Sequence, residues 1–235
     1  MNISGSNIIV TGGSSGTGKA TAALLCSKGA NVLITGRDTG RLTKAAESIG
    51  CSWIQADVSL QEDVDKTFDW VREHWKNRLD VLINNAGIGE FARVEDTPME
   101  SYQRVMAVNF FGPVMMVKKA LPLMKEQKSG SIVNLASTSS QKGFASGSAY
   151  ASSKFALRGF TQSLLEEVRS LNIRVFQINP SEVSTAFGNP ERKERKETDH
   201  KLGPGQLAQT IAAVLELPDK AFVPELSVWA TNPKS

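Results

Sequence analysis

Short apolar segments alternate with longer amphipathic segments along nearly the whole chain, and this alternation limits the possible folds more than any other feature. The apolar segments predict strands at 7–11, 31–35, 51–56, 79–84, 131–136, 173–178 and 225–230. Parallel strands need crossover helices that cover both faces of their sheet. The chain contains no repeat and no low-complexity linker. We therefore expect a single α/β domain over residues 1–235, built on a doubly wound parallel sheet of about seven strands.

The helices between these strands are marked by apolar periodicity and by residues that favour helix ends. We expect helices at 18–28, 38–49, 98–125, 148–171 and 204–215, and one through Val64, Phe68 and Val71. Gly50 is expected to end the second helix, because glycine readily adopts the left-handed conformation that follows helices. Pro98 is expected to open the helix at 98–125, because proline is favoured in a first turn.

The composition is that of an ordinary soluble globular protein, with 40% hydrophobic and 22% charged residues. No apolar run approaches the roughly 18 to 20 residues that a membrane helix requires. Residues 1–6 carry no secretory pattern, so we expect a cytoplasmic protein without a membrane partner. The net charge of +3 is too small to indicate a nucleic-acid partner. Cys26 and Cys51 lack metal-ligand spacing, which favours reduced structural thiols and no metal site.

A glycine-rich turn, TGGSSGTG at residues 11–18, follows the first predicted strand. Its glycines permit a tight turn and a close backbone approach, which would direct amides and a helix N-terminus at a pyrophosphate. Many such turns use glycine for structural reasons alone, but the position between the first strand and the first helix favours a dinucleotide site. The contacts expected in this turn are Gly12, Ser14, Ser15, Gly16, Thr17 and Gly18.

The end of the second strand indicates which dinucleotide is bound. Enzymes that prefer NAD place an acidic residue about 20 positions after the glycines, where it binds the ribose hydroxyl. Here that neighbourhood ends in Arg37, whose guanidinium can pair with the 2′-phosphate of NADP. Asp38 follows directly and could bind the ribose, but an acid at this position is also the expected N-cap of the next helix. We therefore predict NADP.

Tyr150 and Lys154 lie four residues apart on a predicted helix, so their side chains share one face with Cβ atoms about 6 Å apart. An ammonium beside a phenol would favour the phenolate by about 3 to 4 kcal/mol at an effective dielectric of about 20. This would lower the pKa of Tyr150 and suit it to acid–base chemistry. The alternative for the pair alone is a surface tyrosine beside a surface lysine. Ser137 ends a strand ahead of this helix and can donate to a carbonyl oxygen, although Ser139 and Ser140 offer the same chemistry.

Together these motifs resemble those of the short-chain dehydrogenase/reductase family over residues 5–185. The TGxxxGxG turn, the NNAG sequence at 84–87 and the spacing from Ser137 to Tyr150 and Lys154 occur in the family's order. The resemblance implies a Rossmann-type fold and a catalytic tetrad of Asn109, Ser137, Tyr150 and Lys154. It also implies further cofactor contacts: Asp57, Val58, Asn85, Ala86 and Gly87 after two strands, Pro180, Val183 and Thr185 beside the nicotinamide, and Tyr150 and Lys154 themselves. Ser181 departs from the glycine usual in the family.

The resemblance also implies the chemistry of the four residues. Ser137 would polarise a carbonyl, and Tyr150 would protonate the alkoxide formed from it. Lys154 would bind the nicotinamide ribose and lower the tyrosine pKa, while Asn109 would help position a water and the lysine. In isolation, an asparagine in a helix is also a polar residue that locally disturbs it.

The physiological carbonyl is left open by the sequence. The candidates are a 3-oxoacyl thioester, free or bound to a carrier protein, and a general ketone. A carrier protein is acidic, and Lys125, Lys128 and Arg169 could contact it, whereas Leu171 stands where another base would help. The last predicted strand at 225–230 is followed by no glycine pair, and in this it resembles relatives that act on hydroxy acids, small alcohols or general carbonyls. A non-catalytic, nucleotide-sensing regulator is the alternative from another class, although such proteins typically lose the tyrosine or the lysine.

Two further expectations concern substrate access and assembly. Residues 185–203 are expected to form a substrate lid, and the mixed charges at 191–197 are read as a solvated helix face rather than a partner-binding patch. The family usually forms homodimers or homotetramers through its two long helices. Phe110, Phe111, Phe155 and Phe160 could serve that interface or the core.

Overall fold

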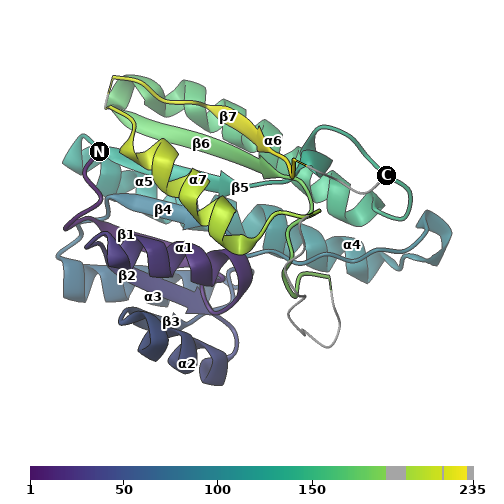
Figure 1. The fold of residues 1–235 in the computed structure, drawn as a ribbon, viewed down its shortest axis with the longest axis horizontal. Coiled ribbons are helices and arrows are strands. Elements are labelled where there is room, and N and C mark those ends of the chain that lie inside the picture. The colour runs from purple at the N-terminus through teal and green to yellow at the C-terminus, as the bar shows by residue number, and fades with distance from the viewer. Residues whose placement is uncertain (189–199, 219, 232–235) are drawn as a thin grey trace.

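The computed structural model describes residues 1–188, 200–218 and 220–231, which form a parallel seven-stranded sheet (Figure 1). Its strand order is β3-β2-β1-β4-β5-β6-β7. This confirms the predicted doubly wound α/β fold. The strands are β1 (Asn7–Thr11), β2 (Asn31–Gly36), β3 (Ser52–Gln55), β4 (Val81–Asn84), β5 (Gly130–Leu135), β6 (Ile173–Pro180) and β7 (Glu225–Val228).

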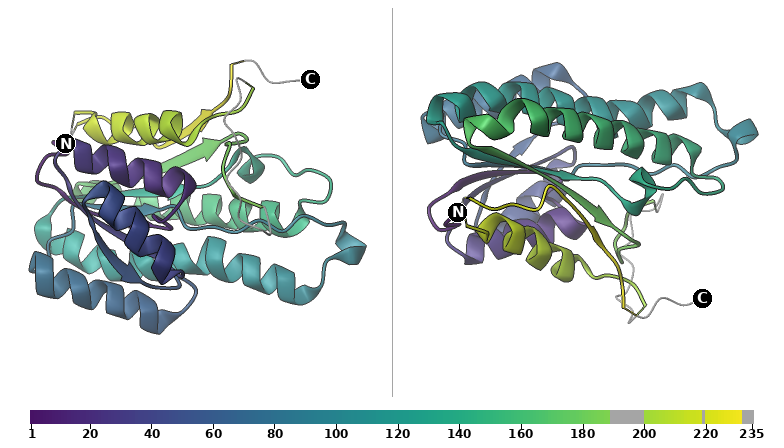
Figure 2. Two further views of the ribbon diagram at one scale, coloured as in Figure 1. Left: turned by 60° about the horizontal axis from the view of Figure 1, so that its bottom comes forward. Right: turned by 90° about the horizontal axis from the view of Figure 1, so that it is seen from above.

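Helices cover both faces of the sheet (Figure 2). One layer contains α1, α2 and α7, and the other contains α3, α5 and α6, with α4 leading into α5. Their bounds are α1 (Gly16–Ser27), α2 (Thr39–Ile49), α3 (Gln61–Trp75), α4 (Met99–Met106), α5 (Gly112–Gln127), α6 (Ser148–Val168) and α7 (Pro204–Glu216). Short 3-10 turns lie at Val94–Asp96, Thr138–Ser140 and Arg169–Leu171.

The core consists of two apolar layers separated by the sheet. Alternate side chains of a strand point to opposite faces, so Ile8 and Val10 pack with α1, α2 and α7, while Ile9 packs with α3, α5 and α6. All three are completely buried. Fully burying such a side chain contributes about 1.5 to 3 kcal/mol. Both faces are therefore apolar along the central strands, which explains why these strands read as short continuous apolar runs.

The helix expected at 98–125 differs most from its prediction. It begins after Pro98 as expected, but a π-helical turn at Ala107–Phe111 divides it into α4 and α5. The side chain of Asn109, inside this turn, makes hydrogen bonds to another loop and to α6. Such turns are frequent at functional sites. The remaining boundaries moved by one to three residues, and Gly50 ends α2 with a φ of 78° as predicted. Within the described residues, every helix is too short or too polar to cross a membrane.

Candidate active site

The four candidate catalytic residues converge near the carboxyl ends of the central strands. Ser137 follows β5, Tyr150 and Lys154 lie in the first half of α6, and Asn109 lies in the π-helical turn. Tyr150 is 8% exposed, Lys154 4% and Asn109 0%. The alternative of a surface tyrosine beside a surface lysine is therefore wrong. Burying these polar side chains costs free energy of folding unless each of them is hydrogen-bonded.

Each of these polar groups has a hydrogen-bond partner. A side-chain hydrogen bond joins Ser137 to Tyr150. The Nζ of Lys154 donates to the carbonyl oxygen of Leu135, the last residue of β5, at 2.9 Å, and lies 5.7 Å from the centre of the Tyr150 ring. The lysine is thus held between the sheet and the phenol. The helical spacing of four residues places both groups on the face of α6 that packs against β5.

Burial controls the ionisation of the tyrosine and the lysine. Burial raises the pKa of Tyr150 to about 12, and the hydrogen bond from Ser137 offsets part of that rise. Burial lowers the pKa of Lys154 to about 8. The expected lowering of the tyrosine pKa by Lys154 is therefore not what this structure displays. The expectation assumed a partly solvated pair, whereas desolvation disfavours the charged form of both groups.

Asn109 fastens the loop after β4 to the catalytic helix. Its side-chain oxygen accepts from the amide of Ile88 at 2.9 Å, and its side-chain nitrogen donates to the carbonyl of the same residue at 2.9 Å. The same nitrogen donates to the hydroxyl of Ser153 in α6 at 3.0 Å. Ser153, which precedes Lys154 in the sequence, is therefore hydrogen-bonded to Asn109 and through it to the loop after β4. The amide acts as a cross-link between segments far apart in the chain.

The structure distinguishes the three candidate serines. The hydroxyl of Ser140 is buried and donates to the carbonyl of Ser137 at 2.7 Å, which commits it to the turn. The amide of Ser139 donates to the hydroxyl of Ser137 at 3.1 Å. Only the hydroxyl of Ser137 is hydrogen-bonded to Tyr150 among these three in the described contacts. This favours Ser137 as the group that meets a substrate oxygen.

A polar network centred on Glu225 supports the turn of the candidate catalytic Ser137, and the sequence did not reveal it. Ser140 contacts the side-chain oxygen of Asn179 at 3.1 Å, and the side-chain nitrogen of Asn179 donates to Glu225 at 2.9 Å. Gln141 donates to the same carboxylate at 2.9 Å, and Arg158 of α6 pairs with it at 3.2 Å. The network links the serine turn, β6, β7 and α6. Members that are bonded directly lie up to 84 residues apart, and no local pattern connects them.

The glycine turn forms a cradle at the start of α1. Gly12 and Gly16 have φ values of 66° and 51°, a region that disfavours other residues. A Cβ at Gly18 would lie 2.3 Å from the carbonyl oxygen of Gly12, so a side chain does not fit there. Ser15 gives α1 no side-chain cap, and the first turn contains no acidic residue. The first amides of α1 therefore suit a pyrophosphate.

The NNAG loop is fastened to this cradle. The amides of Asn85 and Ala86 both donate to the hydroxyl of Thr11 at 3.0 Å. The side chain of Asn85 donates to the carbonyl of Thr11 at 2.8 Å. A Cβ at Gly87 would lie 3.3 Å from the side-chain oxygen of Asn109, which places this glycine between the cradle and the catalytic residues. Thr11 is a second residue with a structural role that the motif analysis did not single out.

Arg37 and Asp57 lie together after neighbouring strands. A guanidinium nitrogen of Arg37 lies 3.8 Å from a carboxylate oxygen of Asp57, and the arginine side chain is 44% exposed. Asp38 accepts a hydrogen bond from the amide of Arg41 at 3.0 Å and is the N-cap of α2, as one of the two interpretations predicted. Val58 is buried, and a Cβ at Gly112 would lie 2.9 Å from it, so its side chain packs under α5.

The segment after β6 also contacts the glycine cradle, through Thr185. Pro180 ends β6, and Val183 forms an isolated bridge with Leu202. Thr185 is buried, and its methyl group lies 3.1 Å from where a Cβ of Gly16 would stand. Ser181, which replaces the family's glycine, pairs its amide with the carbonyl of Val228 at 2.8 Å. It has no positive φ, so a serine fits there without strain.

The residues present fit a dinucleotide with a 2′-phosphate. The cradle has no room for a Cβ at Gly18, exposes helix amides and adjoins Arg37 at the next strand end. Of the expected lid at 185–203, residues 189–199 lie outside the described residues. The mixed charges at 191–197 therefore also lie outside them.

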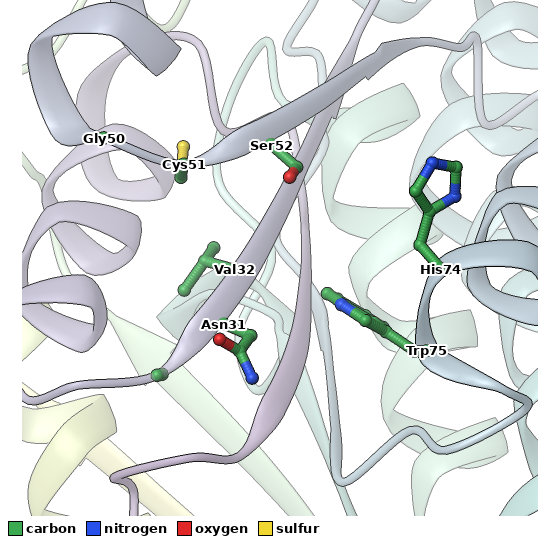
Figure 3. A pocket seen from close by; sticks show the side chains of 8 residues that line it. Asn31, Val32, Gly50, Cys51, Ser52, His74 and Trp75 are labelled. Atoms are coloured by element: carbon green, nitrogen blue, oxygen red, sulfur yellow. The ribbon is translucent and has the colours of Figure 1, made fainter.

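A pocket shown in Figure 3 lies away from this site, at the amino ends of β2 and β3. It is lined by Asn31, Ser52, Trp75 and their neighbours. Cys51 also lines it, and a side-chain hydrogen bond joins Cys51 to Cys26. Both cysteines are free thiols, as expected. The carboxyl ends of the strands, where the catalytic candidates lie, form the opposite edge of the sheet.

Comparison with known proteins finds similarity to oxidoreductases in both sequence and structure. Residues 6–196 match the sequence model of the family described as short chain dehydrogenase. An uncharacterized oxidoreductase of Staphylococcus aureus is 32% identical over 226 residues, covering 94% of this chain and 95% of the relative. An alcohol dehydrogenase from the archaeon Thermococcus sibiricus, complexed with 5-hydroxy-NADP, is similar in structure, with a TM-score of 0.90, 28% identity and 98% coverage of both chains. A metagenomic short-chain oxidoreductase in complex with NADP has a TM-score of 0.83, 28% identity and 100% coverage of both chains.

The network around Glu225 generates a stability prediction. Burial raises the pKa of Glu225, but hydrogen bonds from Gln141 and Asn179 and the charge of Arg158 outweigh it and hold the pKa below its ordinary value. A lowered carboxylate pKa stabilises the fold above the ordinary pKa, and this stability is lost as pH falls through the folded value. Glu225→Gln should therefore lower the free energy of unfolding by about 1 to 2 kcal/mol near neutral pH, with a smaller difference in acid.

Denaturant titration of the two proteins at several pH values measures this difference. Glu216→Gln is the matched control, because Glu216 pairs with Lys28 at 2.7 Å on the surface, with 43% of its side chain exposed. An exposed pair contributes little to stability. Equal losses in the two variants, or a Glu225→Gln effect that does not change with pH, would contradict the role of the network.

Proposed function

The chain belongs to the short-chain dehydrogenase family, and from this premise we propose that it is an NADP-dependent oxidoreductase that moves a hydride between nicotinamide and a carbonyl or secondary alcohol. The observation that carries the proposal is the buried group of Ser137, Tyr150 and Lys154. It lies on the sheet edge that also holds the glycine cradle. Acid–base residues beside a dinucleotide site are what this reaction needs.

The ionisation of the site suits the reductive direction. With a pKa of about 12, Tyr150 carries its proton at neutral pH and can donate it to an alkoxide. Ser137 donates a hydrogen bond to the carbonyl oxygen and holds the carbonyl beside the phenol. With a pKa of about 8, Lys154 is mostly charged near neutral pH, and its ammonium would bind the nicotinamide ribose. When bound, the reduced nicotinamide supplies the hydride that the carbonyl carbon accepts.

Asn109 and the loop after β4 keep the proton-transferring groups in place. Because Asn109 bonds both to Ile88 and to Ser153, it holds the cofactor-side loop against the catalytic helix. It would also orient a water and Lys154, as in the family it resembles. Val183 and Thr185 would contact the nicotinamide ring from the segment after β6.

NADP is the cofactor that the adenosine end favours. Arg37 is exposed and directed to the end of β3, where it meets Asp57, and Asp38 is occupied as a helix cap. A guanidinium that pairs with a phosphate forms charge-assisted hydrogen bonds. The two similar structures described above that were solved with bound nucleotide hold NADP or its hydroxylated form.

A free carbonyl compound is favoured over a substrate bound to a carrier protein. Lys128 and Arg169, which could have contacted a carrier protein, follow the far ends of α5 and α6. Helix α6 has 21 residues and spans about 30 Å at 1.5 Å per residue. Its first turn bears Tyr150, so Arg169 lies near the opposite edge of the sheet. A 3-oxoacyl thioester, a small hydroxy acid and a general ketone are the substrates to compare with one another.

The cofactor assignment is tested with Arg37→Ala. We expect the variant to bind NADPH about 10 to 100 times more weakly, because it loses hydrogen bonds to a charged phosphate of about 1.5 to 3 kcal/mol. Its affinity for NADH should change little. Arg41→Ala is the control, since Arg41 is similarly exposed and pairs with Asp38 instead. A native enzyme that turns over faster with NADH would overturn the NADP assignment.

The acid role is tested with Tyr150→Phe. We expect the rate of ketone reduction to fall about 100 to 10,000-fold, because the variant cannot donate a proton. The variant should still bind NADPH, as measured by fluorescence. Tyr102→Phe is the control, because its hydroxyl meets Ser148 at 2.7 Å and no candidate catalytic group. Near-normal turnover by Tyr150→Phe would remove this residue from the proposed role. Retained NADPH binding without turnover of any carbonyl by the native protein would favour the regulator.

We also propose that the chain forms a homodimer or homotetramer through the outer faces of α5 and α6. Phe111 is 53% exposed and Phe155 is 45% exposed, so both are available to an interface. The ring centres of Phe110 and Phe160 lie 6.3 Å apart, so these two rings pack against each other within the chain. Exposed apolar clusters mark interaction surfaces. Light scattering should give a molar mass of two or four chains for the native protein. The double variant Phe111→Glu, Phe155→Glu should have the mass of a single chain. A native monomer at high concentration would contradict this assembly.

A further inference from the structure

Strands β4, β5 and β6 end side by side at one edge of the sheet (Figure 1). Two phenylalanines from the loops after these strands pack against the ring of Tyr150, and a third packs against one of the two. Phe91 follows β4, Phe144 follows β5 and Phe187 follows β6. The ring centres of Phe91 and Phe187 lie 5.6 and 5.5 Å from that of Tyr150, and both rings meet it edge to face. Phe144 lies 6.0 Å from Phe91. We call these three rings the phenylalanine collar.

The collar is exposed where the tyrosine is not. Phe91 and Phe144 are each 48% exposed and Phe187 is 39% exposed, whereas Tyr150 is 8% exposed. Large apolar rings that remain in water beside a buried polar group form a surface that gains stability when another apolar group covers it. The exposed parts of these three rings are therefore available to a ligand that reaches the hydroxyl group of Tyr150.

Glycines set the positions of the collar rings. A Cβ at Gly89 would lie 2.7 Å from the rings of both Phe91 and Phe187. A Cβ at Gly147 would lie 2.3 Å from the ring of Phe144. Side chains at these two positions would displace the rings, so the backbone is shaped to receive them. The collar is thus built into the loops rather than formed by scattered surface residues.

One side of the collar is attached to the cofactor cradle. The amide of Phe187 donates to the hydroxyl of Thr185 at 3.2 Å. The methyl group of Thr185 in turn lies against Gly16 of the cradle. A ligand that covers the collar and reaches the hydroxyl group of Tyr150 would therefore lie next to the expected nicotinamide contacts. This is the place where the reacting carbonyl has to be.

Among the described residues, two pairs of opposite charge lie in the segments that carry the collar. Glu90, adjacent to Phe91, accepts a hydrogen bond from Arg104 at 2.7 Å. Lys201 is paired with Glu182 across the segment after β6. Lys142 is exposed two residues before Phe144. A substrate carboxylate binds best to a cation directed at it, whereas the collar presents carbon to the site.

We propose that the collar selects carbonyl compounds that carry an aromatic or bulky apolar ring beside the carbonyl group. This rests on the proposed function, because it requires Tyr150 to protonate the substrate oxygen. The substrate ring packs against Phe91, Phe144 and Phe187, and its carbonyl oxygen meets Ser137 and Tyr150. Edge-to-face contacts between aromatic rings add to the binding energy of a substrate ring, and an alkyl group of similar polarity cannot make them.

Three ketones that share a methyl carbonyl test the proposal: acetophenone, acetone and pyruvate carry a phenyl ring, a second methyl group and a carboxylate. We expect kcat/KM with NADPH to be about 100-fold higher for acetophenone than for either of the others. Phe91→Ala and Phe187→Ala should each lower that ratio about tenfold. Ratios within one protein do not depend on how much of it is folded, and NADPH fluorescence confirms an intact cofactor site.

Leu171→Ala is the matched control, because Leu171 is a large apolar residue, 41% exposed, at the far end of α6. It should leave the ratio unchanged. Equal kcat/KM for acetophenone and acetone, a preference for pyruvate, or unchanged ratios in the collar variants would overturn the collar proposal and leave the oxidoreductase function standing. Bound NADPH with no turnover of acetophenone would overturn the collar proposal, and the proposed function itself would fall only if a 3-oxoacyl thioester and a small hydroxy acid also failed to react.

Discussion

The parallel hydrogen-bonded ladder from β1 through β4 and β5 to β6 is the constraint on which the site depends. Because the strands are parallel, all their carboxyl ends lie at one edge, and each following loop begins there. The glycine cradle, the loop of Asn85, the turn of Ser137 and the segment of Thr185 follow these four strands in turn. Apolar packing on both faces leaves that edge as the place where polar side chains gather.

Burial then determines what these side chains can do. The same helix packing that aligns Tyr150 and Lys154 removes both from water, so the neutral phenol and the neutral amine are each favoured relative to solution. A protonated tyrosine is a suitable acid, and its hydrogen bond to Ser137 marks where a substrate oxygen would be received. The chemistry and the fold are therefore coupled by desolvation as much as by geometry.

Hydrogen bonds from two side chains, Asn109 and Glu225, hold the segments of the site together. Asn109 joins the loop after β4 to α6, while Glu225 joins the serine turn to β6, β7 and α6. Each is a single side chain with several partners, and its loss would leave a buried partner, Ser153 or Asn179, with one hydrogen bond fewer. The phenylalanine collar completes the arrangement from the outside, with one ring from each of three adjacent strand ends.

The sequence by itself determined the strands, the crossover helices, the glycine turn and the spacing of Tyr150 and Lys154, because these depend on local periodicity and on the backbone freedom of glycine. It located the nucleotide edge of the sheet for the same reason. Only the tertiary structure decided the π-helical turn at Asn109, the network of Glu225, the collar and the direction of the pKa changes. These depend on strand order and on burial, which bring together residues as far apart as Gln141 and Glu225, and no local pattern records such contacts.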